Sequence, residues 1–326
     1  MRIGVLGPEG SYSEKAAKIW VLKNNLTDIE FQYFGDIEDA FLAAVQEKSD
    51  ISIIPVENSI EGSVGVTLDL LLEKEIVIIA EIVVKIEHCL LSKGRPEDIR
   101  VILSHPQGLA QCRHFLKQHF PEAELRSTGS TSHAARLSGE FEEMAAIASP
   151  EAAECYNLKI LLSNIQDRKE NYTRFLAIKN AKEESEDKDL PLLCPESSSD
   201  KSSERKKSEH ESESGDSDPQ DCERFICEAS IYKTSIIVYL EKDRPGALYE
   251  ILGAFAKRKI NLTKIESRPS KRELGDYYFY IDLQGYAGDS IIKGALEEIR
   301  AKTDTLKVLG SYSAIYSSFK TADLKL

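Results

Sequence analysis

The sequence predicts an α/β domain followed by a smaller βαββαβ module of the ferredoxin-like kind. Three observations support this fold class. Short apolar runs alternate with helical spacing over the first 180 residues, a serine-rich acidic stretch interrupts the chain, and a strand, helix, strand, strand, helix, strand pattern follows it. At 326 residues, the chain is long enough for two or three domains with cores of their own.

The composition indicates an acidic protein without a nucleic-acid surface. The formal charge is −13, and residues 182–224 contribute −8 of it through 15 acidic and 7 basic side chains. The remainder carries only −5, without a basic patch. The six cysteines form no C-x-x-C pair, the N-terminus reads as a strand rather than a signal peptide, and the apolar run 76–84 is too short to span a bilayer. We therefore expect a cytoplasmic protein with reduced thiols.

The N-terminal segment predicts a strand, a tight turn and a capped helix. Residues 2–6 are an apolar run, and the turn Gly7 to Gly10 leads into Ser11, Tyr12, Ser13 and Glu14, which has the form of a capping box. A glycine-rich turn at a helix N-terminus can bind an anion. The glycines do not follow G-x-G-x-x-G, so a dinucleotide site is not predicted.

Polar side chains follow the next strands of the predicted sheet. Residues 51–55 form an apolar strand that runs into Glu57, Asn58 and Ser59. The carboxyl ends of strands are where open α/β sheets bind ligands. A polar turn that caps the helix at 66–74 is an equal alternative.

A second polar junction follows the strand at 101–103. Ser104 has the position of a helix cap before Pro106, and Gln107 and Gln111 are four residues apart on one face of that helix. Two amides can orient a polar ligand without adding charge, although two solvated glutamines would show the same spacing. His88 has no other histidine at metal-ligand spacing, and we interpret it as a structural residue.

The stretch from Asn164 to Ile178 contains the best candidate for a proton donor. It passes from polar residues into an apolar strand at Tyr172, and alternation along that strand places Thr173 and Arg174 on opposite faces. Threonine is also a good β-former, so this residue alone does not define a site. Since no nucleophile triad or metal cluster accompanies it, the junctions suit a small anionic ligand held by hydroxyls, amides and backbone N–H groups.

The second half of the chain separates a linker from a second module. Residues 182–224 contain ten serines among alternating charges and predict a flexible linker. The module is expected to have strands at 234–241, 262–268, 276–286 and 305–312 and helices at 246–259 and 290–302.

These stretches resemble the prephenate dehydratase family with a C-terminal ACT regulatory domain. The family's G-P-x-G-[TS]-[FY]-[ST]-E is matched by Gly7 to Glu14, P-V-E-N-S by Pro55 to Ser59, and S-H-P-Q followed by Q-C by Ser104 to Cys112. Its N-I-Q-D and T-R-F elements correspond to Asn164 to Asp167 and Thr173 to Phe175. In the module, G-A-L and E-S-R-P correspond to Gly246 to Leu248 and Glu266 to Pro269.

The resemblance implies an enzyme that converts prephenate to phenylpyruvate with loss of water and carbon dioxide and without a metal or organic cofactor. The implied catalytic residues are Thr173 as proton donor, Asn58, Ser104, Gln111 and Glu57. The implied substrate-binding residues are Ser11, Tyr12 and Arg174, although strand alternation turns Arg174 away from Thr173.

The resemblance also implies the domain plan and the regulation. Residues 1–180 form a catalytic domain like a type II periplasmic binding protein, with lobe one at about 1–78 and 165–180 and lobe two at about 79–164, and residues 232–315 form the ACT domain. Phenylalanine is expected to bind between ACT domains of a homodimer or homotetramer and to inhibit. The implied effector-binding residues are Gly246, Ala247, Leu248, Asn261, Leu262, Glu266, Ser267 and Arg268.

Two alternatives remain at this point. An arogenate dehydratase would share these motifs and accept an amino group where prephenate has a keto group. A noncatalytic receptor for an aromatic acid would share the two lobes, but would have no need of a proton donor at Thr173.

Overall fold

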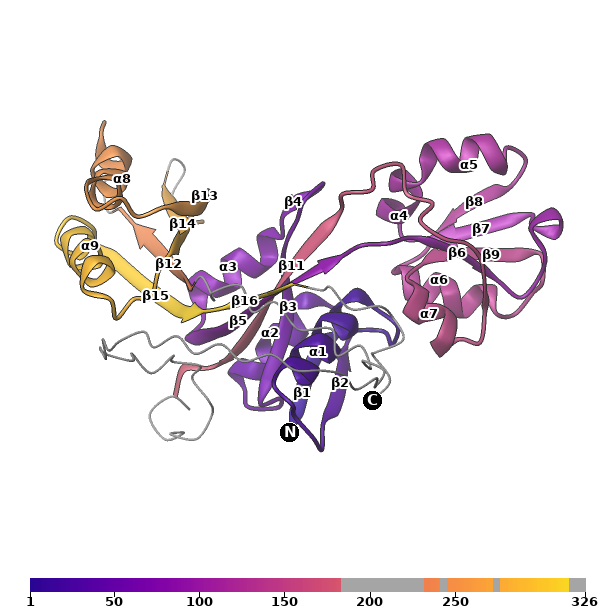
Figure 1. Cartoon of the computed structure of the whole chain (residues 1–326), viewed down its shortest axis with the longest axis horizontal. Helices are drawn as coiled ribbons and strands as arrows, with labels where there is room; N and C mark the ends of the chain where they lie inside the picture. The colour runs from indigo at the N-terminus through magenta and orange to yellow at the C-terminus, as the bar shows by residue number, and fades with distance from the viewer. Residues whose placement is uncertain (183–231, 241–244, 272–275, 317–326) are drawn as a thin grey trace, which may run out of the picture.

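In the computed structural model, which describes residues 1–182, 232–240, 245–271 and 276–316, three bodies lie in a row. Figure 1 shows lobe one in the centre, lobe two on one side and the C-terminal module on the other. Each body is built on its own β-sheet. The predicted fold class, a two-lobed α/β domain followed by a βαββαβ module, is confirmed.

Lobe one is a seven-stranded sheet with helices on both faces. Its strand order is β16-β5-β11-β3-β1-β2, and the short β4 pairs with β3. The central strand β3 is buried from Ile51 to Val56 because α1 covers one face of the sheet and α2 and α3 cover the other. The elements are β1 (Arg2–Leu6), α1 (Tyr12–Lys23), β2 (Glu30–Phe34), α2 (Ile37–Val45), β3 (Ile51–Asn58), β4 (Gly62–Ser63), α3 (Gly65–Glu73), β5 (Ile76–Lys85), β11 (Tyr172–Asn180) and β16 (Ala314–Tyr316).

Lobe two is a five-stranded sheet in the order β10-β6-β9-β7-β8. Its elements are β6 (Cys89–Ser92), the 3-10 helix η1 (Pro96–Asp98), β7 (Val101–Ser104), α4 (Pro106–Gln111), α5 (Arg113–His119), β8 (Glu124–Ser127), α6 (Thr131–Ser138), β9 (Met144–Ala148), α7 (Pro150–Cys155) and β10 (Lys159–Leu162). The predicted crossing between the lobes near residue 78 is too early. Strand β5 pairs with β11 from Ile76 to Lys85, so the chain leaves lobe one only after Lys85.

The C-terminal module has the predicted βαββαβ order. Its elements are β12 (Lys233–Tyr239), α8 (Ala247–Lys257), β13 (Leu262–Pro269), β14 (Tyr277–Gln284), α9 (Ser290–Arg300) and β15 (Thr305–Tyr312). The strand order is β13-β14-β12-β15, and both helices pack on one face of the sheet. After β15, the chain returns to lobe one as β16, a strand that the sequence analysis did not anticipate, and pairs in parallel with β5.

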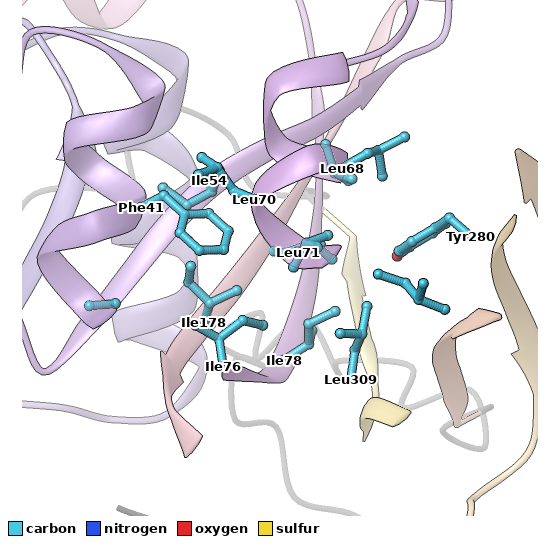
Figure 2. Packing of buried hydrophobic residues seen from close by; sticks show 14 of the residues in the cluster. Phe41, Ile54, Leu68, Leu70, Leu71, Ile76, Ile78, Ile178, Tyr280 and Leu309 are labelled. Carbon is cyan, nitrogen blue, oxygen red and sulfur yellow. The ribbon is translucent and has the colours of Figure 1, made fainter. Parts of the chain in front are cut away.

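The other face of the module's sheet packs directly on lobe one. One apolar core joins Ile54, Leu71 and Ile78 of lobe one to Tyr280 and Leu309 of the module, as Figure 2 shows. These five side chains are all less than 2 % exposed. The module is therefore joined to lobe one through a continuous core.

Two sequence predictions fall partly or wholly outside this description. Apart from Lys182, the predicted linker at 182–224 lies outside the described residues. Cys89, Cys112 and Cys155 are free thiols, and the other three cysteines lie in the undescribed ranges. Among the described helices, none combines the length and apolarity needed to cross a bilayer.

Leu309 provides a test of this shared core. We expect Leu309→Ala to lower the free energy of unfolding by about 2–5 kcal/mol, because the truncation leaves a cavity between the module and lobe one. The neighbouring Val308 is 37 % exposed and serves as the control, with an expected loss below about 1 kcal/mol for Val308→Ala. Urea denaturation measures both values, and equal losses would contradict a shared core at this position.

Candidate active site

The centre of the site is a pair of side chains on two neighbouring strands, Asn58 and Thr173. Asn58 ends β3 and Thr173 begins β11, and the antiparallel pairing places the two residues directly opposite each other. Asn58 Nδ2 donates a hydrogen bond of 3.0 Å to Thr173 Oγ1. Both strands meet here at the point where the chain passes between the lobes (Figure 1).

The backbone fixes the orientation of the Asn58 amide. Asn58 Oδ1 accepts from the N–H groups of Ile60 at 2.9 Å and Glu61 at 3.1 Å, so this atom is the oxygen. Nδ2 must then face Thr173, whose Oγ1 acts as the acceptor. Within the described part of the chain, Thr173 donates its own hydroxyl proton to no protein group, and that proton remains available for a ligand.

The same chain of hydrogen bonds continues to lobe two. Asn58 Nδ2 also donates to Asn171 Oδ1 at 2.8 Å, and Asn171 Nδ2 donates to Gln111 Oε1 at 3.0 Å. Gln111 Oε1 lies 2.8 Å from His88 Nε2. Because Gln111 Oε1 accepts from Asn171, Gln111 Nε2 faces the other way, and it is buried with no hydrogen-bond partner among the described residues.

His88 completes this network as a neutral imidazole. Burial lowers the pKa of His88, and the hydrogen bond to Gln111 opposes this only in part. A neutral ring whose Nε2 donates to Gln111 Oε1 leaves Nδ1 as an acceptor, and Nδ1 is also buried without a partner in the described residues. The network from His88 to Thr173 therefore carries no formal charge. It offers two donors, the Thr173 hydroxyl and the Gln111 Nε2 group.

Two predicted residues, Ser104 and Ser11, hold the local structure around this network. Ser104 is fully buried, and its hydroxyl donates to the backbone carbonyl of Ile147 at 2.7 Å. The expectation that Ser104 caps the next helix is wrong, because His105 is the N-cap of α4 and its ring accepts from the Gln107 N–H. Ser11 does cap α1 as predicted, and its hydroxyl donates to the carbonyl of Leu6 at 2.9 Å.

Tyr12 lies on the lobe-one side of His88. Its hydroxyl donates to the backbone carbonyl of Glu87 at 2.5 Å, and its ring meets the His88 ring edge-on at a centroid distance of 6.3 Å. Burial, reinforced by the charge of Glu151, raises the pKa of Tyr12 well above its usual value. Tyr12 is thus a neutral group that fixes the crossing segment next to His88.

The two charged candidates, Glu57 and Arg174, pair with each other. Arg174 Nη1 lies 2.6 Å from Glu57 Oε2, and Arg174 also contacts Glu81 and Asp282. Burial raises the pKa of Glu57, but the hydrogen bond from Arg174 and the charge of Lys264 outweigh it and lower the pKa. Burial lowers the pKa of Arg174, and the charges of Asp282 and Glu81 overcome this effect and raise it. Both side chains are therefore ionised and compensated by protein groups.

The predicted effector residues divide into three groups. Glu266 and Arg268 on β13 face lobe one, where they contact Ser63 and Asp69. Asn261 and Ser267 are exposed. The other four are Gly246, with the left-handed φ of 89° at the N-terminus of α8, buried Ala247, and half-buried Leu248 and Leu262.

The sequence analysis did not propose Asn171 as a site residue, and it interpreted His88 as a structural residue. Asn171 precedes Thr173 by two residues, and a period of two places both on one face of an extended chain. That spacing was the available signal. The contact of His88 with Gln111 joins residues 23 positions apart in lobe two and has no sequence pattern.

Comparisons with known proteins find relatives for both parts of the chain. A family model described as prephenate dehydratase matches residues 3–183, and an ACT domain model matches residues 234–301. The prephenate dehydratase of Methanocaldococcus jannaschii is 37% identical over 309 residues, which cover 94% of this chain and 95% of that protein. The bifunctional chorismate mutase/prephenate dehydratase of Aquifex aeolicus is 36% identical over 313 residues, covering 96% of this chain and 73% of that protein.

A solved structure agrees over most of its length. The prephenate dehydratase from Arthrobacter aurescens in complex with L-Phe has a TM-score of 0.74 and 30% sequence identity, covering 96% of this chain and 90% of that chain. At that identity and coverage, both the two-lobed part and the C-terminal module have counterparts in a solved relative.

The neutral state of His88 predicts a pH dependence of stability. In the unfolded chain the imidazole takes up a proton below its ordinary pKa of about 6.5, whereas the folded protein resists protonation to lower pH. The unfolded state then binds more protons, so stability is full above about pH 6.5 and falls as the pH decreases. We expect His88→Gln to lose this part of the slope and His114→Gln, at an exposed position, to retain it. Urea denaturation between about pH 7.5 and 5.5 checks this, and parallel slopes in all three proteins would contradict it.

Proposed function

The chain belongs to the prephenate dehydratase family, and on this premise we propose that it converts prephenate to phenylpyruvate, with Thr173 as the proton donor. The observation that carries the proposal is the hydrogen bond of 3.0 Å from Asn58 Nδ2 to Thr173 Oγ1. Because Thr173 accepts from Asn58, its own proton is free to be donated to a ligand. The same contact stabilises the oxygen as that proton leaves.

The reaction needs one acid and good orientation. The bond between the ring and its carboxylate breaks, its electron pair enters the ring, and the ring hydroxyl leaves from the opposite carbon. Thr173 protonates this hydroxyl, so that water and carbon dioxide depart, and solvent returns the proton to Thr173. Since aromatisation drives these steps, the protein mainly has to hold the dianion in one pose, and a charge-free network of amides and a hydroxyl suits that role.

Gln111 is proposed to bind the substrate directly. Its Nε2 is buried without an acceptor among the described residues, and a buried donor of this kind costs about 1–3 kcal/mol unless a ligand satisfies it. A carboxylate or the keto oxygen of prephenate supplies such an acceptor. Asn171 is proposed as the positioning residue that links Gln111 to Asn58.

The remaining candidates receive supporting roles in this proposal. Ser104 and Ser11 direct their hydroxyl protons at backbone carbonyls, and Arg174 and Glu57 neutralise each other. Tyr12 fixes the crossing segment next to His88. The substrate site is then built from Thr173, Asn58 and Gln111, without a charged side chain in direct contact.

Phenylalanine is proposed as the allosteric ligand of the C-terminal module. The relative from Arthrobacter aurescens was solved in complex with L-Phe, and this chain carries the corresponding module. We propose that the subunits associate through their modules as a homodimer or homotetramer. Exposed apolar side chains on the module, Tyr249 at 79% and Ile291 at 58%, support such an association.

Replacing Thr173 tests the proposed chemistry. We expect Thr173→Ala to lower kcat by about 10²–10⁴-fold with a small change in KM, because the acid is lost and the carboxylate contacts remain. Thr173→Ser keeps the hydroxyl and is expected to retain most of the turnover. Formation of phenylpyruvate, followed by ultraviolet absorbance with prephenate and with arogenate as substrates, gives both constants. Turnover of Thr173→Ala equal to that of the unaltered protein would remove the assignment.

Replacing Gly246 tests the regulatory proposal. Its left-handed φ of 89° is unfavourable for alanine, so Gly246→Ala is expected to distort the N-terminus of α8. We expect phenylalanine to inhibit the unaltered protein with a coupling of about 1–3 kcal/mol and to inhibit Gly246→Ala much more weakly. Gly253→Ala is the matched control, since Gly253 lies inside α8 and an added Cβ would meet no atom within 4 Å outside the local helix backbone. Equal inhibition of both variants would place the effector elsewhere.

A further inference from the structure

A buried ionic cluster crosses the boundary between lobe one and the C-terminal module. Arg174 Nη2 lies 2.7 Å from Asp282 Oδ2 and 2.6 Å from Glu81 Oε2, while Arg174 Nη1 lies 2.6 Å from Glu57. The module also supplies two lysines, with Lys264 Nζ 3.1 Å from Glu57 and Lys233 Nζ 2.6 Å from Glu81. Lys264 Nζ also lies 3.5 Å from Glu266 of the module. The ionic cluster thus consists of Arg174, Glu57 and Glu81 from lobe one and Lys233, Lys264, Asp282 and Glu266 from the module.

Three ion pairs of this cluster join the two parts, Arg174 with Asp282, Lys264 with Glu57 and Lys233 with Glu81. Lobe one contributes two carboxylates and one guanidinium, and the module contributes two ammonium groups and two carboxylates. Glu81 is 1 % exposed and Asp282 is fully buried. Buried charges of this kind require their partners, and removal of one partner leaves an uncompensated charge that forces its neighbours to rearrange.

The ionic cluster is next to the pair formed by Thr173 and Asn58 on the same two strands. Strands β3 and β11 pair Thr173 with Asn58 and, at the next position, Arg174 with Glu57. An irregularity follows immediately between Arg174 and Phe175. A bulge interrupts the ladder of backbone hydrogen bonds, so side-chain contacts contribute more to strand orientation at this point than in a regular sheet. A rotation of Arg174 or Glu57 about its strand therefore also rotates Thr173 or Asn58.

We propose that Asp282 and Lys264 of the C-terminal module are positioning residues for the reaction at Thr173. They hold Arg174 and Glu57, and through these two residues they set the geometry of the hydrogen bond between Asn58 and Thr173. Neither residue touches the substrate. This inference rests on the proposed dehydratase function and assigns part of the catalytic geometry to a domain outside the two lobes.

The competing explanation is that the ionic cluster only holds the module in place. Lys307 provides the comparison, because it docks the module on lobe one at another point. Its Nζ donates to the carbonyls of Leu71 at 3.2 Å and Leu72 at 3.4 Å, at the end of α3. No described contact of Lys307 involves the ionic cluster. If the ionic cluster only holds the module in place, removal of a cluster contact and removal of the Lys307 contacts should affect catalysis equally.

The experiment compares Asp282→Asn with Lys307→Met in the full chain, using prephenate turnover at a temperature well below unfolding. We expect Asp282→Asn to lower kcat by about tenfold or more while KM changes less than about threefold, since misplacement by about 1 Å can cost a factor of about 10². Lys307→Met is expected to keep both constants within about twofold. A kcat of Asp282→Asn within twofold of the unaltered protein, or equal losses in both variants, would overturn the inference.

A second variant keeps the inference testable if Asp282→Asn does not fold. Lys264→Met removes the contact with Glu57 from the other end of the ionic cluster, and we expect the same loss of kcat at nearly constant KM. Unchanged kcat in Lys264→Met would overturn the inference in that case. The proposed function fails separately, when the unaltered protein yields no phenylpyruvate from prephenate.

Discussion

The structure depends on one cross-strand contact, the hydrogen bond from Asn58 to Thr173 where β3 and β11 pair. The amide of Asn58 is held by two backbone N–H groups, and this orientation decides which atom of Thr173 accepts and which proton stays free. The contact is also the point from which hydrogen bonds extend to Gln111 in lobe two. At the next position of the same strands, Arg174 and Glu57 reach the C-terminal module. All three bodies of the protein therefore converge on two neighbouring residue pairs of β3 and β11.

Much of the fold could be predicted from the sequence because its signals are local. The apolar run at Ile51 to Pro55, the capping box at Ser11 and the βαββαβ order of the module each follow from spacing within about a dozen residues. The length of β5 and the return of β16 to lobe one could not be predicted, because both depend on pairing between distant segments. A run such as Ile76 to Lys85 reads as a strand but does not say in which sheet it lies.

The candidate site was predictable in its polar junctions and less so in the roles of single residues. Motif resemblance brought Asn58, Gln111 and Thr173 forward together, and the structure joins them in one network through Asn171. The same motifs also suggested Ser104 and Arg174, whose side chains have protein partners in the structure. Ser104 donates its hydroxyl proton to the carbonyl of Ile147. Arg174 forms ion pairs with three carboxylates, one of them 108 residues away in the module. These contacts join residues that are far apart in the sequence. A linear motif therefore cannot distinguish a residue that binds substrate from one that supports it.

The most direct test is a crystal structure of the protein with an unreactive analogue of prephenate that retains the ring hydroxyl. The proposed chemistry requires Thr173 Oγ1 within hydrogen-bonding distance of that hydroxyl, about 2.6–3.2 Å, with Gln111 Nε2 on a carboxylate or the keto oxygen. An analogue bound between the lobes with its ring hydroxyl out of reach of Thr173, on another donor of the protein, would contradict the account.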